Sequence, residues 1–463
     1  MDNLRENKMG TAPLLKLIMS MALPAMFSMI VQALYNIVDS IFVGQYRYNG
    51  DTSLGLAAVS LAFPLQMLLI SIAVGTGVGI NSLVSRKLGE KKQDEANSAA
   101  THGLILGFCN WVLMLILGLT IVSPFINSYT DNPVIAQMGT EYLSIVMIFS
   151  FGVCIEVIIE KSLQATGNMI FPMIFMLTGA VTNIILDPIC IFTLNMGVKG
   201  AAVATVAGQI LSLIVALCVL FGRKHAIHIS FKNFKLSGTV IKNIYAVAIP
   251  AIIMQSITSV MLILVNSIFN IKFPGKDGQD AITVLGIYFK LQSFIFMPCF
   301  GLNQGLLPIM GYNYGARKKK RLTDTLKYGC IIAIIIMAVG TVLFLSVPDL
   351  LMKMFNASDN MMNLGGTALR IICISFIPAA LGIVFTAMFQ ATGHGLRSMC
   401  ISLLRQIVVL VPAAYLLADI TLNAVWFAFP IAEAFSLIMA VVFFITLYKK
   451  KIKYLDKPDI VKF

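Results

Sequence analysis

Long apolar stretches alternate with short polar connections along the whole chain. A helix needs about 20 residues to cross a bilayer, and twelve stretches reach that length. Because a segment in lipid must satisfy its backbone hydrogen bonds internally, each stretch predicts one helix. We therefore predict an all-α membrane protein with 12 transmembrane helices. The predicted spans are 14–42, 54–80, 97–124, 138–161, 169–194, 198–222, 243–271, 281–309, 325–347, 362–390, 395–418 and 421–447.

Small and polar residues recur along this pattern at a constant offset of 226 residues. Gln164-Ala165-Thr166-Gly167 returns as Gln390-Ala391-Thr392-Gly393, and Ala22-Leu23-Pro24-Ala25 returns as Ala248-Ile249-Pro250-Ala251. The repeat unit holds six spans, so both copies enter the membrane in the same direction. We therefore expect two six-helix bundles related by a pseudo-two-fold axis along the membrane normal.

The longest polar connection divides the two copies. We expect an N-terminal six-helix lobe at 1–222, a cytoplasmic inter-lobe loop at 223–242, and a C-terminal six-helix lobe with a basic cytoplasmic tail at 243–463. Glycines at small-xxx-small spacing allow close helix contact within the bundles. They are Gly75 and Gly79 in the second span, and Gly301 and Gly305 in the eighth.

Composition agrees with a membrane protein, and the charge distribution sets its orientation. Hydrophobic residues make up 58% of the chain and charged residues 12%, where a soluble domain has about 25% charged residues. The net charge of +13 does not indicate nucleic acid, because 26 of the 34 Lys and Arg residues fall in the termini and the even-numbered connections. This positive-inside bias predicts that both termini lie in the cytoplasm. Contact of the basic runs with anionic membrane lipid is a secondary expectation.

Five acidic residues lie within the predicted spans. An acid at membrane depth costs on the order of 3 kcal/mol, so it marks an ion or substrate path. Most of these acids have no counterpart in the second copy, because Glu156, Glu160 and Asp187 align with Gly382, Thr386 and Ala413. Two copies of one scaffold with ionisable chemistry kept in one copy are what an ion-coupled carrier needs. The acids are Asp39, Glu156, Glu160, Asp187 and Glu433.

Four oxygen-bearing side chains of the first copy are expected at one depth. Asp39 lies about six residues, roughly 9 Å, below the outer end of the first span. Asp187 and Thr205 lie at similar depths in the fifth and sixth spans, and Asn183 is one turn from Asp187 on the same helix face. Carboxylate, amide and hydroxyl oxygens suit a proton or a hard cation such as Na⁺. The alternative is that these groups bond one another and only specify helix packing.

Further polar side chains form stripes that lead to or from these four residues. Gln32, Tyr35 and Asn36 follow one face of the first span towards Asp39, and Gln209 follows Thr205. Glu156 and Glu160 form a stripe on the fourth span and are candidates for a proton relay or a substrate contact. For Glu160, which precedes Lys161 at the membrane edge, the alternative is that it simply reaches the interface. Glu433 stands alone on the twelfth span.

The sequence resembles the multidrug and toxic compound extrusion (MATE) family, most closely its DinF-like bacterial branch with the MepA-like exporters. The likeness extends from Ala22 to the last span. The segments that carry it are Leu34-Tyr35-Asn36-Ile37-Val38-Asp39-Ser40-Ile41-Phe42-Val43-Gly44, Leu163-Gln164-Ala165-Thr166-Gly167-Asn168, Asn183-Ile184-Ile185-Leu186-Asp187-Pro188, Gly197-Val198-Lys199-Gly200-Ala201-Ala202 and Tyr312-Asn313-Tyr314-Gly315-Ala316.

The resemblance implies a secondary antiporter that expels cationic, amphipathic organic compounds in exchange for H⁺ or Na⁺, with no cofactor. It implies a proton or cation site at Asp39, Asn183, Asp187 and Thr205. It also implies a hinge in the first span at Pro24. We expect the protein to act as a monomer, with organic cations and membrane lipid as its partners.

Three other classes of protein remain as alternatives at this point. A lipid-linked saccharide flippase or exporter of the same superfamily should show a cationic cavity, and we expect no buried Lys or Arg in the first half. An intramembrane aspartyl protease would use Asp39 and Asp187, but neither lies in a Gly-x-Gly-Asp motif. A channel is the third. ATP-driven transport is disfavoured because the chain has no Gly-x₄-Gly-Lys-Ser/Thr motif. We therefore expect a transporter and not an enzyme.

Overall fold

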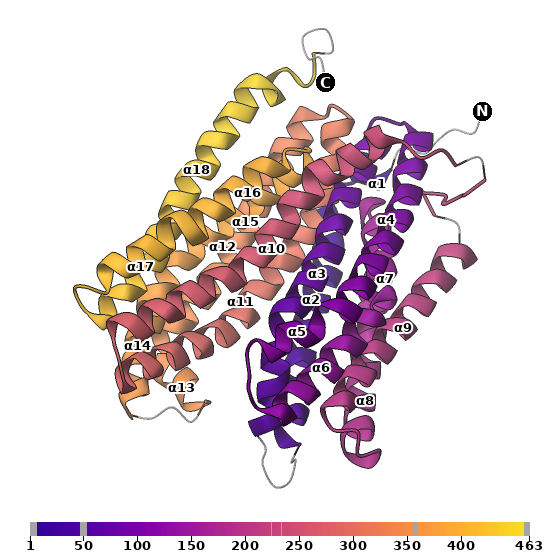
Figure 1. Cartoon of the computed structure of the whole chain (residues 1–463). Coiled ribbons are helices and arrows are strands. Elements are labelled where there is room, and N and C mark those ends of the chain that lie inside the picture. Colours follow the sequence, from indigo (N-terminus) through magenta and orange to yellow (C-terminus); the bar gives the residue numbers. More distant parts are fainter. Residues whose placement is uncertain (1–6, 47–52, 224, 233, 356–358, 458–463) are drawn as a thin grey trace. The chain divides into compact units, whose positions relative to one another are not determined.

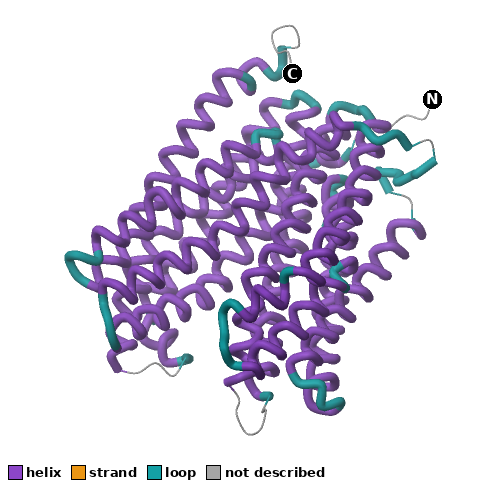
Figure 2. Tube along the Cα trace, in the orientation of Figure 1, coloured by secondary structure: helices purple, strands orange, loops and turns teal. Residues whose placement is uncertain are grey.

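The computed structural model describes residues 7–46, 53–223, 225–232, 234–355 and 359–457, and this part of the chain is helical throughout, with no strand (Figures 1 and 2). The α-helices are α1 (Lys8–Thr11), α2 (Leu14–Gln45), α3 (Ser53–Gly89), α4 (Gln93–Thr120), α5 (Val122–Asn127), α6 (Pro133–Ile148), α7 (Phe151–Ala165), α8 (Ile170–Pro188), α9 (Val198–Gly222), α10 (Gly238–Lys272), α11 (Lys276–Gly315), α12 (Lys319–Ser346), α13 (Pro348–Lys353), α14 (Asp359–Ile372), α15 (Phe376–Ala391), α16 (Gly395–Leu403), α17 (Val411–Leu417) and α18 (Ala428–Lys450). Five short 3₁₀- or π-helical segments join or extend them: η1 (Ile189–Thr193), η2 (Cys373–Ser375), η3 (Leu404–Leu410), η4 (Leu422–Phe427) and η5 (Ile452–Tyr454).

The twelve predicted spans are confirmed, with one of them broken. Within the described residues, eleven helical segments are long and apolar enough to cross a membrane, and α6 with α7 makes a twelfth that bends by 45°. The bend falls at Phe149 and Ser150, where no proline interrupts the sequence. Just beyond it, Gly152 packs on the backbone of Gln209, and a Cβ atom at Gly152 would lie 3.1 Å from the Gln209 carbonyl carbon. A close contact between helices α7 and α9 therefore accompanies the break.

The chain forms two compact units, which we call the N-unit (27–252) and the C-unit (1–26 with 253–463). These units differ from the two sequence halves by an exchange of helix segments. The first part of α2 belongs to the C-unit, and the first part of α10 belongs to the N-unit. Pro24 and Pro250, which are repeat partners, each lie two residues before the point where their helix passes from one unit to the other. The lobe boundaries at 222 and 243 stay a prediction.

The glycines of the repeat make this exchange possible. In the N-unit, a Cβ atom at Gly75 would lie 2.8 Å from the backbone nitrogen of Ile252, so α3 and α10 touch through their backbones. In the C-unit, a Cβ atom at Gly305 would lie 3.0 Å from the Cα atom of Ala22, so α11 and α2 do the same. Small residues four apart therefore hold each exchanged helix segment, as their spacing predicts.

The repeat is also visible in backbone conformation. Gly167 and Gly393 have φ values of 88° and 80° directly after α7 and α15, where each helix ends in a left-handed residue. Lys91 and Arg317 have φ values of 59° and 56° in the turns after α3 and α11. Both pairs are separated by 226 residues, so the two copies share turn geometry even where their side chains differ.

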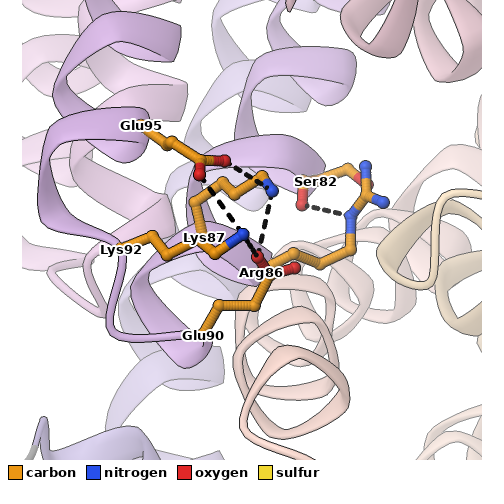
Figure 3. A network of polar contacts seen from close by, with 6 residues as sticks. All are labelled: Ser82, Arg86, Lys87, Glu90, Lys92 and Glu95. Atoms are coloured by element: carbon orange, nitrogen blue, oxygen red, sulfur yellow. Dashed lines mark hydrogen bonds and ion pairs between the residues drawn. The ribbon is translucent and has the colours of Figure 1, made fainter. Parts of the chain in front are cut away.

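The turn between α3 and α4 carries a network of ion pairs at its surface (Figure 3). Lys87 Nζ contacts Glu95 Oε2 at 2.7 Å and Glu90 Oε2 at 2.9 Å, and Lys92 Nζ contacts the same two carboxylates at 3.2 and 3.3 Å. Arg86 Nε donates to the carbonyl oxygen of Ser82 at 3.0 Å. Because these groups are largely solvated, the network orients the turn more than it stabilises the fold.

Candidate functional site

Three of the four predicted site residues are joined by hydrogen bonds inside the N-unit. The Asn183 amide Nδ2 donates to Asp187 Oδ1 and to Thr205 Oγ1, each at 3.3 Å. Asn183 and Asp187 lie one turn apart on α8, and Thr205 faces them from α9. All three are buried, and Asp187 is fully enclosed.

Asp39 completes the group from α2. Its carboxyl group lies within hydrogen-bonding range of the Asp187 carboxyl group. Asp39 itself is half-buried, whereas Asp187 is 0% exposed. The structure therefore brings all four predicted residues together in one unit, and no Lys, Arg or His among the described residues forms an ion pair with either carboxyl group.

Several oxygens of this group have no hydrogen-bond partner among the described residues. They are Asp39 Oδ1, Asn183 Oδ1 and Asp187 Oδ2, and each is shielded from solvent. Leaving a buried acceptor unsatisfied costs about 1–3 kcal/mol, so three unsatisfied oxygens in one place indicate a site for a ligand. The donors are carboxylate and amide oxygens, which suit a proton or a hard cation. No metal cofactor is needed to explain them.

Local backbone features set the position of these side chains. Directly after Asp187 and Pro188, α8 passes into the π-helical segment η1, since proline cannot continue the α-helical hydrogen-bond ladder. Such π-helical turns are frequent at functional sites. On the other side of Asn183, helices α8 and α9 touch at two glycines, where a Cβ atom at Gly208 would lie 2.7 Å from the Gly179 carbonyl oxygen. This contact brings Thr205 within reach of Asn183.

Two tyrosines lie close to the carboxyl pair, and the sequence predicted only one of them. Tyr35 on α2 lies near both Asp39 and Asp187, as its place in the polar stripe suggested. Tyr142 on α6 lies near the same two acids, and its hydroxyl group is hydrogen-bonded to Gln66 on α3. Tyr142 and Gln66 were missed because a single tyrosine or glutamine in an apolar span does not reveal which way it faces.

The remaining residues of the stripes are less enclosed. Gln32 is half-buried and Asn36 is exposed on α2. On α9, Gln209 is half-buried, but its Oε1 atom is shielded and has no hydrogen-bond partner among the described residues. Pro24 lies inside α2, which is one continuous helix over Leu14–Gln45. The roles of these four residues stay predictions.

A second polar group of the N-unit lies on α7. Lys161 Nζ contacts Glu160 Oε1 at 2.9 Å and Gln164 Oε1 at 3.2 Å, and the Gln164 amide donates to the same Glu160 oxygen at 2.6 Å. Glu160, Lys161 and Gln164 are all buried, and Glu156 is buried one turn away, bonded to Ser212. The interfacial interpretation of Glu160 is therefore wrong, because its carboxylate turns inward to Lys161 instead of reaching the membrane surface.

Lys161 also corrects the expectation that the first half holds no buried cation. Its side chain is 6% exposed, and its aliphatic part packs where Gly77 of α3 has no side chain. A Cβ atom at Gly77 would lie 2.6 Å from Lys161 Cγ. The ammonium group is neutralised by Glu160, so it adds no net positive charge to the interior of the N-unit.

Comparison with known proteins identifies the family. The family model MatE matches residues 24–189 and 250–416, which follow the two copies of the repeat and cover more than half of the chain. The chain belongs to the MatE family. The predicted resemblance is therefore confirmed.

Relatives of this MatE protein extend over nearly its whole length. Multidrug export protein MepA of Staphylococcus haemolyticus (strain JCSC1435) is 26% identical over 448 residues, which are 96% of each chain. The outward-facing structure of a multidrug resistance MATE family transporter of the MOP superfamily matches with a TM-score of 0.89 at 26% identity. It covers 98% of this chain and 99% of that one. A MOP superfamily transporter from Pyrococcus furiosus matches with the same identity and coverage and a TM-score of 0.90.

These matches also confirm the fold class. A TM-score of about 0.9 over almost the full length of both chains shows that this MatE protein shares the twelve-helix, two-lobe fold of these transporters. It is a multi-pass membrane protein of a transporter family and not an enzyme. Among the predicted functions, the aspartyl protease is thereby excluded.

Proposed function

We propose that this MatE protein is a secondary multidrug antiporter. It would export cationic, amphipathic organic compounds across a bacterial cytoplasmic membrane in exchange for H⁺ or Na⁺. The MepA relatives, which are named multidrug export proteins, support the substrate class. The observation that carries the coupling is the contact between the Asp39 and Asp187 carboxyl groups beside three buried, unpartnered oxygens.

Charge explains how this group of residues couples two fluxes. Two neighbouring carboxylates hold a negative charge that is costly at membrane depth, so they bind either an organic cation or an inorganic one. Uptake of H⁺ or Na⁺ removes the charge that retains the drug, which is then released. Asn183 and Thr205 supply the amide and hydroxyl groups that fix one carboxylate while its charge changes. No cofactor takes part.

The conformational part of the cycle is assigned to α2. Asp39 and Pro24 lie on this one helix, and the helix passes from the C-unit to the N-unit two residues after Pro24. A change of charge at Asp39 would alter the free energy of bending at Pro24, because proline already removes one backbone hydrogen bond there. Glu156 and Glu160 are assigned to a proton relay on α7.

A proteoliposome assay with ethidium tests this function. Inward-directed pH and Na⁺ gradients are imposed one at a time, with both termini of the protein expected on the cytoplasmic side. We expect ethidium export with at least one gradient, and its loss in Asp39→Asn and in Asp187→Asn. Intact gradient-driven export in both variants would contradict the proposal.

Single-channel recording separates the proposal from a channel. A carrier gives no unitary currents, because one conformational cycle moves only one set of ions. A lipid-linked saccharide exporter is disfavoured by the N-unit, where the buried Lys161 is neutralised by Glu160 and no cationic cavity results.

A further inference from the structure

The C-unit contains a half-buried ion pair that lies apart from the group around Asp39 and Asp187. Arg405 Nη1 contacts Glu433 Oε1 at 3.0 Å, and the two side chains are 28% and 14% exposed. Glu433, which stands alone in the sequence, is therefore paired. Lys290 and Arg370, two other cations within spans of the C-unit, are exposed instead.

Both partners lie near the middle of their spans. Arg405 comes about ten residues, roughly 15 Å, after the start of the span Gly395–Leu417. Glu433 comes about eleven residues after the start of the span Leu422–Tyr454, which runs in the opposite direction. Transporters bind their substrates near the membrane midplane, so the pair lies at the depth where a substrate is held.

The repeated scaffold does not require this pair. Arg405 and Glu433 correspond, at the offset of 226, to Gly179 and Ala207 in the N-unit, next to the close contact between Gly179 and Gly208. The first copy therefore packs the same two helices through small residues. Since replacing an ion pair inside a protein by apolar groups is often neutral or stabilising, packing alone does not explain why charges are found here.

The surroundings of the pair indicate unused binding capacity. Glu433 Oε2 and Gln406 Oε1 are shielded from solvent and have no hydrogen-bond partner among the described residues. Gln406 is 4% exposed and follows Arg405 directly in the π-helical segment η3. Tyr288 on α11 lies beside both charged groups. Glu433 thus pairs with Arg405 through one oxygen, while its other oxygen has no partner among the described residues.

We propose that Arg405 and Glu433 form a recognition site for substrates that carry both a carboxylate and an organic cation. The carboxylate of such a zwitterion would bind the guanidinium group of Arg405, and its cationic group would bind Glu433. Planar two-pronged hydrogen bonding makes arginine well suited to a carboxylate. This inference rests on the proposed export function and adds a substrate class to it.

Charge balance gives the site its selectivity. When a zwitterion binds, the ion pair between Arg405 and Glu433 is replaced by two ion pairs with the ligand. Neither Arg405 nor Glu433 is then left uncompensated. A plain cation would take Glu433 away from Arg405 and leave the guanidinium group unpaired at membrane depth, which is strongly unfavourable. Plain cations are therefore expected to bind elsewhere, at the acidic group around Asp39 and Asp187.

Two fluorescent probes that differ by one ester test this proposal. Rhodamine 19 carries a free carboxylate and a delocalised cation, and rhodamine 6G is its ethyl ester and a plain cation. Export of each is measured in proteoliposomes for the wild type, Arg405→Gln, Arg405→Lys and Glu433→Gln. Lys290→Gln is the matched control, because it removes an exposed charge from another span of the C-unit.

We expect Arg405→Gln to raise the KM for rhodamine 19 about tenfold while the KM for rhodamine 6G changes less than twofold. Arg405→Lys should recover part of the loss, and Lys290→Gln should change neither value. Equal losses of export for both probes would show that the pair is merely structural and would overturn the proposal. A wild type that exports rhodamine 6G but not rhodamine 19 would overturn it as well. Absence of export for both probes and for ethidium in the wild type would instead contradict the proposed function.

If Arg405→Gln does not fold, equilibrium binding decides the question. Rhodamine 19 binding to the purified wild type is measured by equilibrium dialysis in the presence of excess rhodamine 6G, and the two dyes are separated by chromatography before they are quantified. Independent sites predict that rhodamine 6G leaves at least half of the rhodamine 19 bound. Complete displacement, with the affinity expected for one common site, would overturn the proposal.

Discussion

The same pair of helices carries opposite chemistry in the two units of the molecule. In the N-unit, α8 and α9 touch at glycines and present Asn183, Asp187 and Thr205 to the carboxyl group of Asp39. In the C-unit, η3 and α18 are joined by Arg405 and Glu433. The N-unit group carries two acids, and no described base forms an ion pair with either of them, whereas the C-unit pair is balanced. We propose that the duplicated scaffold divides its tasks in this way: unbalanced charge serves coupling, and balanced charge serves recognition.

The largest expected effect is a loss of export when Asp187, in the N-unit, is changed. Asp187→Asn keeps the shape of the side chain but removes its charge, so we expect gradient-driven ethidium export to fall by about tenfold or more, as in other coupled sites. Its repeat partner provides the control. Ala413→Asn introduces the same amide at the corresponding position of the C-unit and should leave ethidium export near the wild-type rate.

The next largest effect is a loss of folding stability when Glu433, in the C-unit, is changed. Glu433→Ala leaves Arg405 without its partner, and we expect the free energy of unfolding to fall by about 1–3 kcal/mol, since breaking a half-buried pair is worse than replacing both partners. Unfolding in detergent, followed by tryptophan fluorescence, measures the change. The double variant Arg405→Met/Glu433→Leu should regain most of the loss. If the double variant is as unstable as Glu433→Ala, the charge argument does not hold.

A smaller effect sharpens the role of the hydroxyl group at the coupling site. Thr205→Val keeps the side-chain shape and removes the oxygen that accepts a hydrogen bond from Asn183. The loss of one such bond is worth about 1 kcal/mol, so cation binding should weaken about fivefold. Thr205→Ser should restore it. Equal affinities in the wild type and Thr205→Val would remove Thr205 from the site.

The smallest effect is expected outside the membrane, at the turn shown in Figure 3. The hydrogen bonds that Lys92 donates to Glu95 and Glu90 raise the pKa of Lys92, so any stabilisation they give is present at neutral pH and is lost as the pH rises through that raised value. Because Lys92 is solvated, Lys92→Ala should leave the melting temperature unchanged at pH 7. A clear drop would show that charge pairs at the surface matter as much as the half-buried pair of the C-unit.

Sequence reasoning predicted the spans and the grouping of Asp39, Asn183, Asp187 and Thr205, because both depend largely on local spacing. The apolar stretches gave the twelve helices, and the separation of four residues between Asn183 and Asp187 placed both on one face of α8. Topology then gave Asp39 and Thr205 a similar depth.

Features that depend on helix rotation were not predictable in the same way. Tyr142 reaches the carboxyl pair from α6, and Glu433 meets Arg405 from a neighbouring helix, but the sequence does not show which face either residue occupies. The exchange of α2 and α10 between the units depends on where backbones touch at Gly75 and Gly305. No proline lies at the bend between α6 and α7, so the sequence does not predict that bend.

Competition between drug and inorganic cation tests the central claim most directly. Ethidium binding to the purified protein is measured by fluorescence while pH is varied at fixed Na⁺, and while Na⁺ is varied at fixed pH. The account predicts that the apparent Kd rises in proportion to the activity of the coupling cation, and that Asp187→Asn abolishes this dependence. A Kd that is independent of both cations in the wild type, or an unchanged dependence in Asp187→Asn, would contradict it.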